Sequence, residues 1–444
     1  MSDTVLHLGF DDIDSPTGGC TTHFTSLLVE DLEGFGVRWL DYPGLVRLNP
    51  GIPYRTRGNG AVVLRLSVDG ARLEEIVDLV KTRVESYANL EYPNTNPGFV
   101  MVRGDVPERV RRFSERALWR SLPIELASRI IQREKLVHHG FGNRRGLIGA
   151  LASVGNKLTE DYTFEFIAYR SPEACGHERG VDWDSVARMD SVLRPQVFAN
   201  IDSSNSQVLV EPHGPDPVLF GVRGENPDAV KRGGLMVRSH QAVERWMIFR
   251  TNQATGAHLT HEMTIDTLRP YMAAKVRASV SKRARIIEGG HVIFGIADDT
   301  GEVDCAVYEP TGEFRDTANR LMVGDRVVIH GSVRPASRTH PMTLNVEGVE
   351  VVALTPKIRV SNPLCARCGK RMKSAGRGKG FKCDNCGHRE RNGEKVRTTL
   401  ERTLTVGLYL PPPRAQRHLT RPFERPEKGN MGVPVKMIDE WHRP

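Results

Sequence analysis

Four cysteines near the C-terminus constrain the fold most strongly. They form two CxxC pairs, Cys365 with Cys368 and Cys383 with Cys386, and fourteen residues separate the pairs. This spacing is typical of a zinc ribbon, in which two thiolate turns close one tetrahedral site. Four thiolates leave no open position on the metal, so the predicted Zn²⁺ is structural and helps to fold a module too small for its own core. Two CxxC pairs without a thioredoxin-like context disfavour a redox role.

The remaining cysteines, Cys20, Cys175 and Cys305, are scattered, which favours metal binding in a reducing compartment over disulfides. No stretch approaches the roughly 18 apolar residues of a membrane span, and residues 1–12 lack a basic and apolar leader. We therefore expect a cytoplasmic protein that does not enter a membrane.

The positive charge of the chain is concentrated at its C-terminal end. Residues 361–444 hold 19 Lys and Arg against 8 Asp and Glu, whereas residues 1–360 hold 43 against 46. Such a local surplus is expected for a polyanionic partner, and no amphipathic basic helix accompanies it to favour a membrane. The sequence predicts a nucleic-acid partner, with a solubilising tail as the alternative.

The 444-residue chain has the length of three or four domains. To about residue 265 strand and helix patterns alternate, with strands at residues 4–10, 61–68 and 163–169 and helices at 20–34 and 73–87. This alternation predicts a parallel or mixed sheet with flanking helices, in two sub-domains that meet near residue 135.

From about residue 270 the pattern changes to short strands and turns. Strands are predicted at residues 275–286, 291–298 and 302–308, then a helix at 311–321 and a strand at 325–333. Three strands, a helix and further strands fit an OB-fold, which binds oligonucleotides on its middle strands. A small barrel that only separates two domains is the alternative.

An acidic turn follows the first predicted strand. Asp11, Asp12 and Asp14 supply the hard oxygen ligands that bind Mg²⁺ on nucleotide phosphates, although solvated acidic turns are also common. Gly18 and Gly19 then precede Thr21 at the start of a helix, where free N–H groups and the helix dipole favour a phosphate. A simple threonine N-cap is the alternative.

A second turn-rich segment, residues 47–60, is suited to polyphosphate contacts. It holds Arg47, Arg55, Arg57 and Asn59 directly before a strand. A hairpin loop with solvated arginines would have the same composition. The chain contains neither a Gly-x4-Gly-Lys-Ser/Thr loop nor a Ser-Gly-Gly-x-Asp-Ser loop, so no standard ATP motif is present.

Several short runs resemble the archaeal tRNA(Ile) 2-agmatinylcytidine synthetases. They are residues 9–15 (GFDDIDS), 19–22 (GCTT), 47–50 (RLNP), 52–53 (IP), 56–61 (TRGNGA) and 249–253 (FRTNQ). The resemblance covers essentially the whole chain and implies a multidomain α/β plus β protein. Its expected parts are an ATP-binding kinase-like domain (1–135), a ferredoxin-like domain (136–268), an OB-fold (269–356), and a zinc ribbon with a basic C-terminal arm (357–444).

The resemblance implies an ATP-dependent ligase. Enzymes of this family attach agmatine to the wobble cytidine of an isoleucine tRNA with a CAU anticodon, releasing AMP and pyrophosphate, so that the tRNA decodes AUA instead of AUG. Family members also autophosphorylate a threonine that corresponds by position to Thr21. The implied cofactors are ATP, Mg²⁺ and structural Zn²⁺.

Agmatine is dicationic, so its pocket needs carboxylates or carbonyls. Asp202, Glu211 and Asp216 are the candidates, and solvated loop acids are the alternative. Two other functions remain open. The chain could be a non-catalytic tRNA or single-stranded nucleic-acid binding protein that uses the OB-fold and ribbon, or it could conjugate a different amine on the same scaffold.

Overall fold

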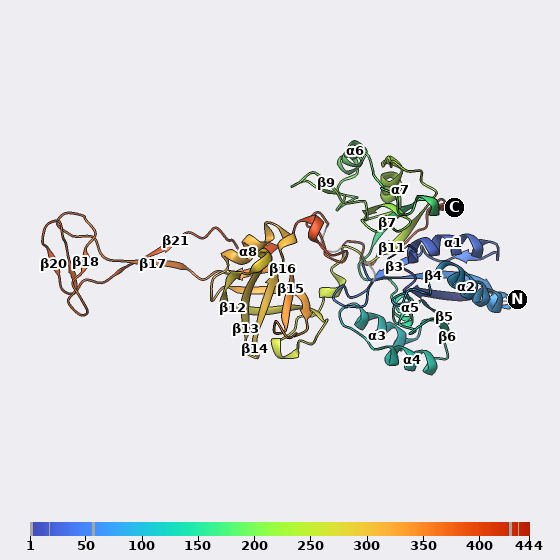
Figure 1. The fold of residues 1–444 in the computed structure, drawn as a ribbon, viewed down its shortest axis with the longest axis horizontal. Coiled ribbons are helices and arrows are strands. Elements are labelled where there is room, and N and C mark those ends of the chain that lie inside the picture. Colours follow the sequence, from blue (N-terminus) through green and yellow to red (C-terminus); the bar gives the residue numbers. More distant parts are fainter. Residues whose placement is uncertain (1–2, 17, 56–57, 426–428, 434) are drawn as a thin grey trace.

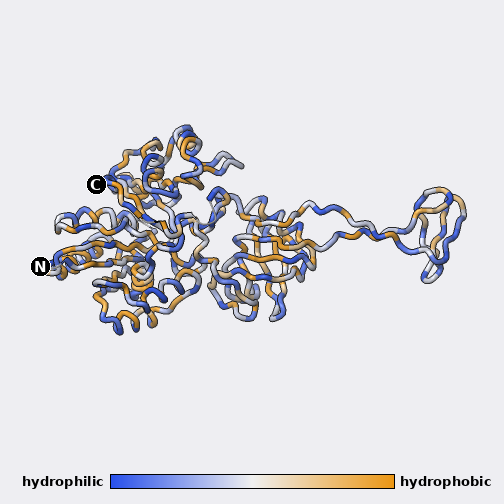
Figure 2. The backbone as a smooth tube through the Cα atoms, turned by 180° about the vertical axis from the view of Figure 1, so that it is seen from behind, coloured by the Kyte–Doolittle hydropathy of each residue, from blue (hydrophilic) through white to orange (hydrophobic). Residues whose placement is uncertain are grey.

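The computed structural model describes residues 3–16, 18–55, 58–425, 429–433 and 435–444. Three bodies follow one another along the long axis: an α/β body that holds both termini, a β-barrel, and a small module at the end of a two-stranded arm (Figure 1). Hydrophobic residues are concentrated in the α/β body and the barrel, as Figure 2 shows. Within the described residues, no helix is long and apolar enough to cross a membrane.

One sheet runs through the whole α/β body, in the order β10-β7-β11-β3-β4-β1-β5-β6, with β2 paired to β4 and β23 to β11. The parallel pair β3–β11 joins the strands of the N-terminal third to those that follow, and the other described pairs in this sheet are antiparallel. The sheet is therefore mixed, which is one of the two forms, parallel or mixed, that the sequence predicted. Its strands are β1 (Asp3–Asp11), β2 (Arg38–Trp39), β3 (Gly44–Arg47), β4 (Gly60–Asp69), β5 (Gly98–Arg103), β6 (Val137–Gly140), β7 (Thr163–Tyr169), β10 (Val218–Gly224), β11 (Arg245–Thr251) and β23 (His442–Arg443).

Among the described residues, seven α-helices belong to this body: α1 (Thr21–Glu33), α2 (Leu73–Tyr87), α3 (Glu108–Ala117), α4 (Ile124–Arg133), α5 (Gly146–Gly155), α6 (Trp183–Leu193) and α7 (Pro227–Met236). Almost every residue of α5 is buried, because the helix packs on β1, β4 and β5 and on α3. The sub-domain boundary near residue 135 stays a prediction, and β6 and α5, which follow it, pack on strands of the N-terminal part. A separate pair, β8 (Ile201–Asp202) and β9 (Gln207–Val208), forms a small hairpin.

The barrel has the order of elements expected for an OB-fold. Its strands are antiparallel except where β14 and β16 pair in parallel and close the barrel. The helix α8 lies between β14 and β15 in the sequence, as the pattern predicted. The elements are β12 (Ala273–Ile286), β13 (Val292–Asp298), β14 (Gly301–Val307), α8 (Phe314–Arg320), β15 (Arg326–Arg334) and β16 (Thr343–Ala353).

The chain leaves the barrel through β17 (Lys357–Ser361), forms the small module with β18 (Lys373–Ser374), β19 (Phe381–Lys382) and β20 (Arg389–Glu390), and returns through β21 (Val396–Leu400). It then adds β22 (Gly407–Tyr409) to the edge of the barrel and ends as β23 on the large sheet. The described residues of the C-terminal arm pack on the protein itself, along the barrel and the α/β body (Figure 1).

A buried contact between a histidine and a carboxylate joins the α/β body to the barrel. His258, in the short 3-10 turn Ala257–Leu259, lies with Nε2 2.9 Å from a carboxylate oxygen of Glu347 on β16. Burial would raise the pKa of Glu347, but the charges of His258 and Arg417 outweigh it, and the pKa is lowered to about 2. Ionised Glu347 therefore stabilises the fold fully above pH 4.5, and this stabilisation is lost as the pH falls towards 2.

The pair makes a testable contribution to acid stability. We expect Glu347→Gln to remove on the order of 3 kcal/mol from the rise in unfolding free energy between pH 2 and pH 5, measured by urea unfolding at each pH. Glu350→Gln, an exposed neighbour on the same strand, is the control and should retain the wild-type slope. If the unfolding free energy of Glu347→Gln rose between pH 2 and pH 5 as much as that of the wild type, this role of the pair would be contradicted.

Candidate active site and metal centre

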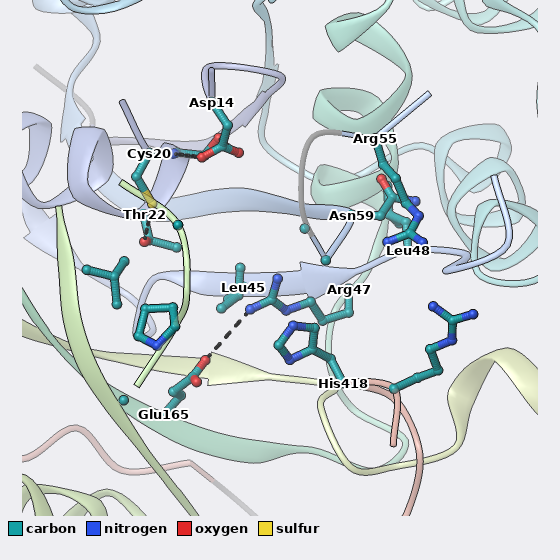
Figure 3. Close-up of a pocket in the computed structure, with 18 of the residues that line it drawn as sticks. Asp14, Cys20, Thr22, Leu45, Arg47, Leu48, Arg55, Asn59, Glu165 and His418 are labelled. Atoms are coloured by element: carbon teal, nitrogen blue, oxygen red, sulfur yellow. Dashed lines mark hydrogen bonds and ion pairs between the residues drawn. The ribbon is translucent and has the colours of Figure 1, made fainter. Parts of the chain in front are cut away.

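A cavity of about 730 Å³ lies where four segments of the chain meet. Its wall includes the acidic turn after β1, the turn-rich segment between β3 and β4, residues 207–216, and part of the C-terminal arm, residues 413–422. Figure 3 shows Asp14 of the acidic turn, Arg47 and Arg55 of the turn-rich segment and His418 of the C-terminal arm around the space. Most of the predicted site residues are therefore brought together, although they are far apart in the sequence.

Two partly buried carboxylates, Asp11 and Asp12, line the cavity. Asp11 packs directly on Gly149 of α5, where any Cβ would overlap its carboxylate. Burial, reinforced by the charge of Asp12, raises the pKa of Asp11 well above its usual value. Asp12 accepts from the Arg145 guanidinium at 3.2 Å and from the Asn96 amide at 3.3 Å, yet burial outweighs these contacts and raises its pKa to about 6.

These carboxylates fit a divalent cation. Adjacent, partly buried acids with raised pKa values are destabilised as anions, and a cation would relieve that repulsion. Magnesium is commonly held by one or two carboxylates together with substrate phosphates. In the described chain, Asp11, Asp12 and Asp14 do not converge on a single point. Asp11 and Asp12 are therefore the better matched pair of ligands.

Asp14 instead organises the start of α1. Its carboxylate accepts from the amide of Thr21 at 3.1 Å and from the Thr21 hydroxyl at 3.2 Å. Thr21 is buried and lines the cavity. Gly18 and Gly19 have positive φ values of 141° and 78° and shape the tight turn that begins at Ser15, but the described lining of the cavity includes neither glycine.

Another part of the cavity lining, which we call the arginine wall, consists of Arg47, Arg55 and Arg223. Arg47 lies 4.0 Å from a carboxylate oxygen of Glu165 on β7, as Figure 3 shows, and Arg223 of β10 donates to the same carboxylate at 3.2 Å. Asn252 holds the backbone of Arg47 through hydrogen bonds of 2.7 and 2.9 Å. The FRTNQ run, residues 249–253, therefore contributes to the site by fixing the position of Arg47.

The other residues predicted to bind nucleotide lie on the same segment. Arg55 and Asn59 line the cavity, and the Asn59 side chain donates to the carbonyl of Asn49 at 2.7 Å. Arg57 lies outside the described residues.

The three acids proposed for agmatine lie in different surroundings. Glu211 lines the cavity, and burial raises its pKa. Asp216 also lines the cavity, but its carboxylate accepts from the Val218 amide at 2.9 Å and lies 3.9 Å from Arg179. Asp202 is absent from the described lining and instead pairs with Arg414 of the C-terminal arm at 2.8 Å.

Sequence reasoning missed Glu165, Arg223 and His418, all of which line the cavity. Glu165 offered a signal, because an acid between Phe164 and Phe166 in a largely apolar strand is expected to have a buried partner. Arg223 and His418 carried no comparable signal, since only the tertiary fold brings β10 and the C-terminal arm to this place.

The contact between Gly149 and Asp11 predicts a sensitive position outside the acidic turn. We expect Gly149→Ala to displace the Asp11 carboxylate and to lower the rate of the ATP-dependent reaction that the sequence resemblance implies by about 100-fold, because small misplacements at a reacting centre have effects of this size. Initial rates under saturating substrates would measure it. Gly34→Ala, at the end of α1 and in ordinary backbone conformation, is the control. A wild-type rate for Gly149→Ala would mean that Asp11 takes no part in the reaction.

The four cysteines of the small module form the predicted metal centre. Their sulfur atoms all lie within 4.8 Å of one another, with Cys365 3.5 Å from Cys386 and Cys368 3.4 Å from Cys383. A tetrahedral zinc site with Zn–S bonds of about 2.3 Å separates its sulfurs by roughly 3.8 Å. Together with Met372 and Phe381, two of the cysteines make up the small buried core of the module. The donor set thus fits structural Zn²⁺ and matches the zinc-ribbon prediction.

Family models match four consecutive parts of the chain. Residues 7–143 match the TiaS TCKD domain and residues 144–258 the TiaS FLD domain. Residues 274–352 match the OB-fold nucleic acid binding domain, and residues 362–404 match the TiaS C-terminal zinc ribbon domain. The expected combination of two α/β parts, an OB-fold and a zinc ribbon is confirmed.

Full-length relatives match as well. The isoleucine-tRNA 2-agmatinylcytidine synthetases TiaS of Staphylothermus marinus and Methanosarcina mazei are each 41% identical, over 96% of this chain and 94% and 98% of theirs. The crystal structure of TiaS in complex with its isoleucine tRNA and ATP superposes with a TM-score of 0.85 at 40% identity, covering 94% of this chain and 96% of that one. A complex of TiaS with the same tRNA, AMPCPP and agmatine has a TM-score of 0.82 at 38% identity, with the same coverage. The chain therefore belongs to the TiaS family of isoleucine-tRNA 2-agmatinylcytidine synthetases.

Proposed function

We propose that this protein is an ATP-dependent ligase that attaches agmatine to the wobble cytidine of an isoleucine tRNA with a CAU anticodon, releasing AMP and pyrophosphate. One observation carries the proposal: a single cavity combines partly buried carboxylates, a helix N-terminus with a hydroxyl side chain, and several arginines. These are the groups needed to hold a nucleotide triphosphate and to stabilise charge during phosphoryl transfer. Relatives solved with an isoleucine tRNA, ATP and agmatine support it.

Each side of the cavity has a proposed role. Asp11 and Asp12 would hold Mg²⁺, which offsets charge on the triphosphate. Arg47, Arg55 and Arg57 would contact its phosphates, with Asn59 bonded to the Asn49 carbonyl beside them and Gly18 and Gly19 shaping the turn before α1. The reaction needs such groups because the oxygen on the cytosine ring leaves poorly until ATP has converted it into a phosphate ester.

Thr21 is the proposed site of autophosphorylation. Its hydroxyl lies at the N-terminus of α1 and is held by the Asp14 carboxylate, which can accept its proton as a phosphoryl group is attached. The helix N-terminus favours the resulting phosphate, whereas Asp14 opposes it, so the modified state would depend on a bound cation.

The agmatine site is proposed at the end of the cavity lined by Glu211 and Asp216. Glu211 is the better placed to meet a cation, since one of its carboxylate oxygens is buried and makes no hydrogen bond to a described residue. Asp202 is proposed to act indirectly, by holding Arg414 of the C-terminal arm. The proposed substrates, ATP and tRNA, are cytoplasmic molecules, which supports the location expected from the cysteines.

The fate of ATP separates a ligase from a non-catalytic tRNA-binding protein. With tRNA transcript, agmatine and ATP labelled on the α-phosphate, we expect labelled AMP only when tRNA and agmatine are both present. Putrescine in place of agmatine is the control for an enzyme that uses a different amine. Tight tRNA binding without AMP formation would support the binding-protein function instead.

A further inference from the structure

The C-terminal arm enters the cavity after it returns from the zinc ribbon. Arg417, His418 and Thr420 line the cavity, although they follow the barrel in the sequence. Two backbone hydrogen bonds seat this stretch on the α/β body: the Ala254 amide donates to the His418 carbonyl at 2.8 Å, and the Gly256 amide donates to the Leu419 carbonyl at 2.7 Å.

Further along, a buried arginine anchors the arm. Arg425 donates to the Asp161 carboxylate at 2.6 Å and to the Glu225 carboxylate at 2.8 Å. The C-terminal arm is therefore held firmly in place beside the cavity that it lines.

The His418 side chain contacts two parts of the arginine wall. Its Nδ1 lies 3.1 Å from a terminal nitrogen of Arg223, and because a guanidinium can only donate, Nδ1 must accept. On its other side the ring lies against Gly58, where an added Cβ would be 2.5 Å from Cδ2 and 2.7 Å from Nε2. Figure 3 shows the ring beside Arg47. The imidazole therefore fills the space between β10 and the segment that carries Arg55.

The surroundings require this imidazole to be neutral. Burial, followed by the charges of Arg47, Arg223, Arg55 and Arg417, lowers the pKa of His418 well below its usual value. A protonated ring would also direct an N–H at the guanidinium of Arg223. His418 and the Glu165 side chain both accept hydrogen bonds from Arg223, so the guanidinium is held from two sides.

We propose that His418 is a positioning residue that holds Arg223 in place for a polyphosphate ligand, so that the arm after the zinc ribbon completes the anion-binding wall. The proposal deepens the proposed function and rests on it for the identity of that ligand as ATP. A merely structural role, in which the ring only fills space, is the alternative that the test must exclude.

Three variants distinguish a His418 that positions Arg223 from a His418 that only fills space. His418→Asn keeps an acceptor close to the place of Nδ1, whereas His418→Leu keeps similar bulk without an acceptor. Leu419→Ala opens space at a buried neighbour on the same arm that is not among the described lining residues. The probe is inorganic tripolyphosphate with Mg²⁺, titrated calorimetrically into the full chain, and the melting temperature of each variant is recorded.

We expect His418→Leu to weaken tripolyphosphate binding about tenfold and His418→Asn to remain within about threefold of the wild type, as fits the loss of one hydrogen bond to a charged group. Leu419→Ala should lower the melting temperature without changing the affinity. Wild-type affinity in His418→Leu, or equal weakening in all three variants, would overturn the proposal, as would failure of the wild type to bind tripolyphosphate.

The same proteins, assayed for agmatine addition to tRNA, distinguish the two proposals. If the wild type binds tripolyphosphate in a manner that depends on His418 but forms no adduct, the proposed reaction is wrong, whereas the positioning role of His418 is supported. If the wild type forms the adduct and His418→Leu retains the wild-type KM for ATP, the reaction stands and the positioning role is wrong.

Discussion

Replacing Asp12 by asparagine is expected to lower the rate of ATP-dependent tRNA modification by at least about 1,000-fold, because it removes a charge worth several kcal/mol to a bound cation and its phosphates. Asparagine suits this position, since Asp12 has a φ of 61° and asparagine tolerates the left-handed region. It also retains an acceptor for the Asn96 amide and for Arg145. The rate should be measured under single-turnover conditions, with tRNA affinity measured in parallel.

Affinity for tRNA should remain within about twofold of the wild type, since the substitution affects only the acidic end of the cavity. Asp105→Asn, an exposed acid elsewhere on the α/β body, is the matched control and should behave as the wild type in both assays. A modification rate within tenfold of the wild type for Asp12→Asn would show that this carboxylate holds no essential cation.

Replacing Cys383 by serine should unfold the zinc ribbon and leave the rest of the protein folded. Structural zinc contributes on the order of 10 kcal/mol to modules of this kind, and the buried core here is limited to two cysteines, Met372 and Phe381. We expect loss of stoichiometric zinc and rapid amide exchange throughout residues 362–395. The basic residues of the module would then no longer be held along a phosphate backbone, so tRNA binding should weaken by about tenfold or more at 0.1 M salt.

The thermal transition of the α/β body and barrel should not change, because the two-stranded arm separates the ribbon from both (Figure 1). Cys175→Ser removes a thiol that is outside the metal centre and should retain zinc. Slow amide exchange in a zinc-free ribbon would contradict the assignment of the metal as a folding element.

Local patterns in the sequence predicted those parts of the molecule that depend on near neighbours. The cysteine spacing was enough to predict the metal centre, because four thiolates at these intervals typically form one tetrahedral zinc site. The helix over residues 73–87 and the strand over 163–169 agree with α2 and β7, because an amphipathic period and an apolar run are properties of the segment itself. The barrel followed from the order of its strands and helix.

Long-range pairing could not be predicted in the same way. The parallel pair of β3 and β11 joins residues about 200 positions apart, and no local pattern specifies it. Asp14 and Asp202 were selected for their charge, but a carboxylate can equally bind a helix N-terminus or an arginine, and the fold supplies both partners. His418 reaches the cavity only because the arm returns past the barrel, which its basic composition did not indicate.

The most direct test of the account is the mass of the wobble nucleoside. The purified protein would be incubated with an isoleucine tRNA transcript carrying CAU, Mg-ATP and isotopically labelled agmatine, with the methionine tRNA of the same anticodon as the control, and the digested nucleosides analysed by mass spectrometry. We predict a cytidine that carries the label of agmatine at the wobble position of the isoleucine tRNA alone. Unmodified cytidine in both tRNAs, despite tight binding and intact ATP, would contradict the assignment of this protein as a ligase.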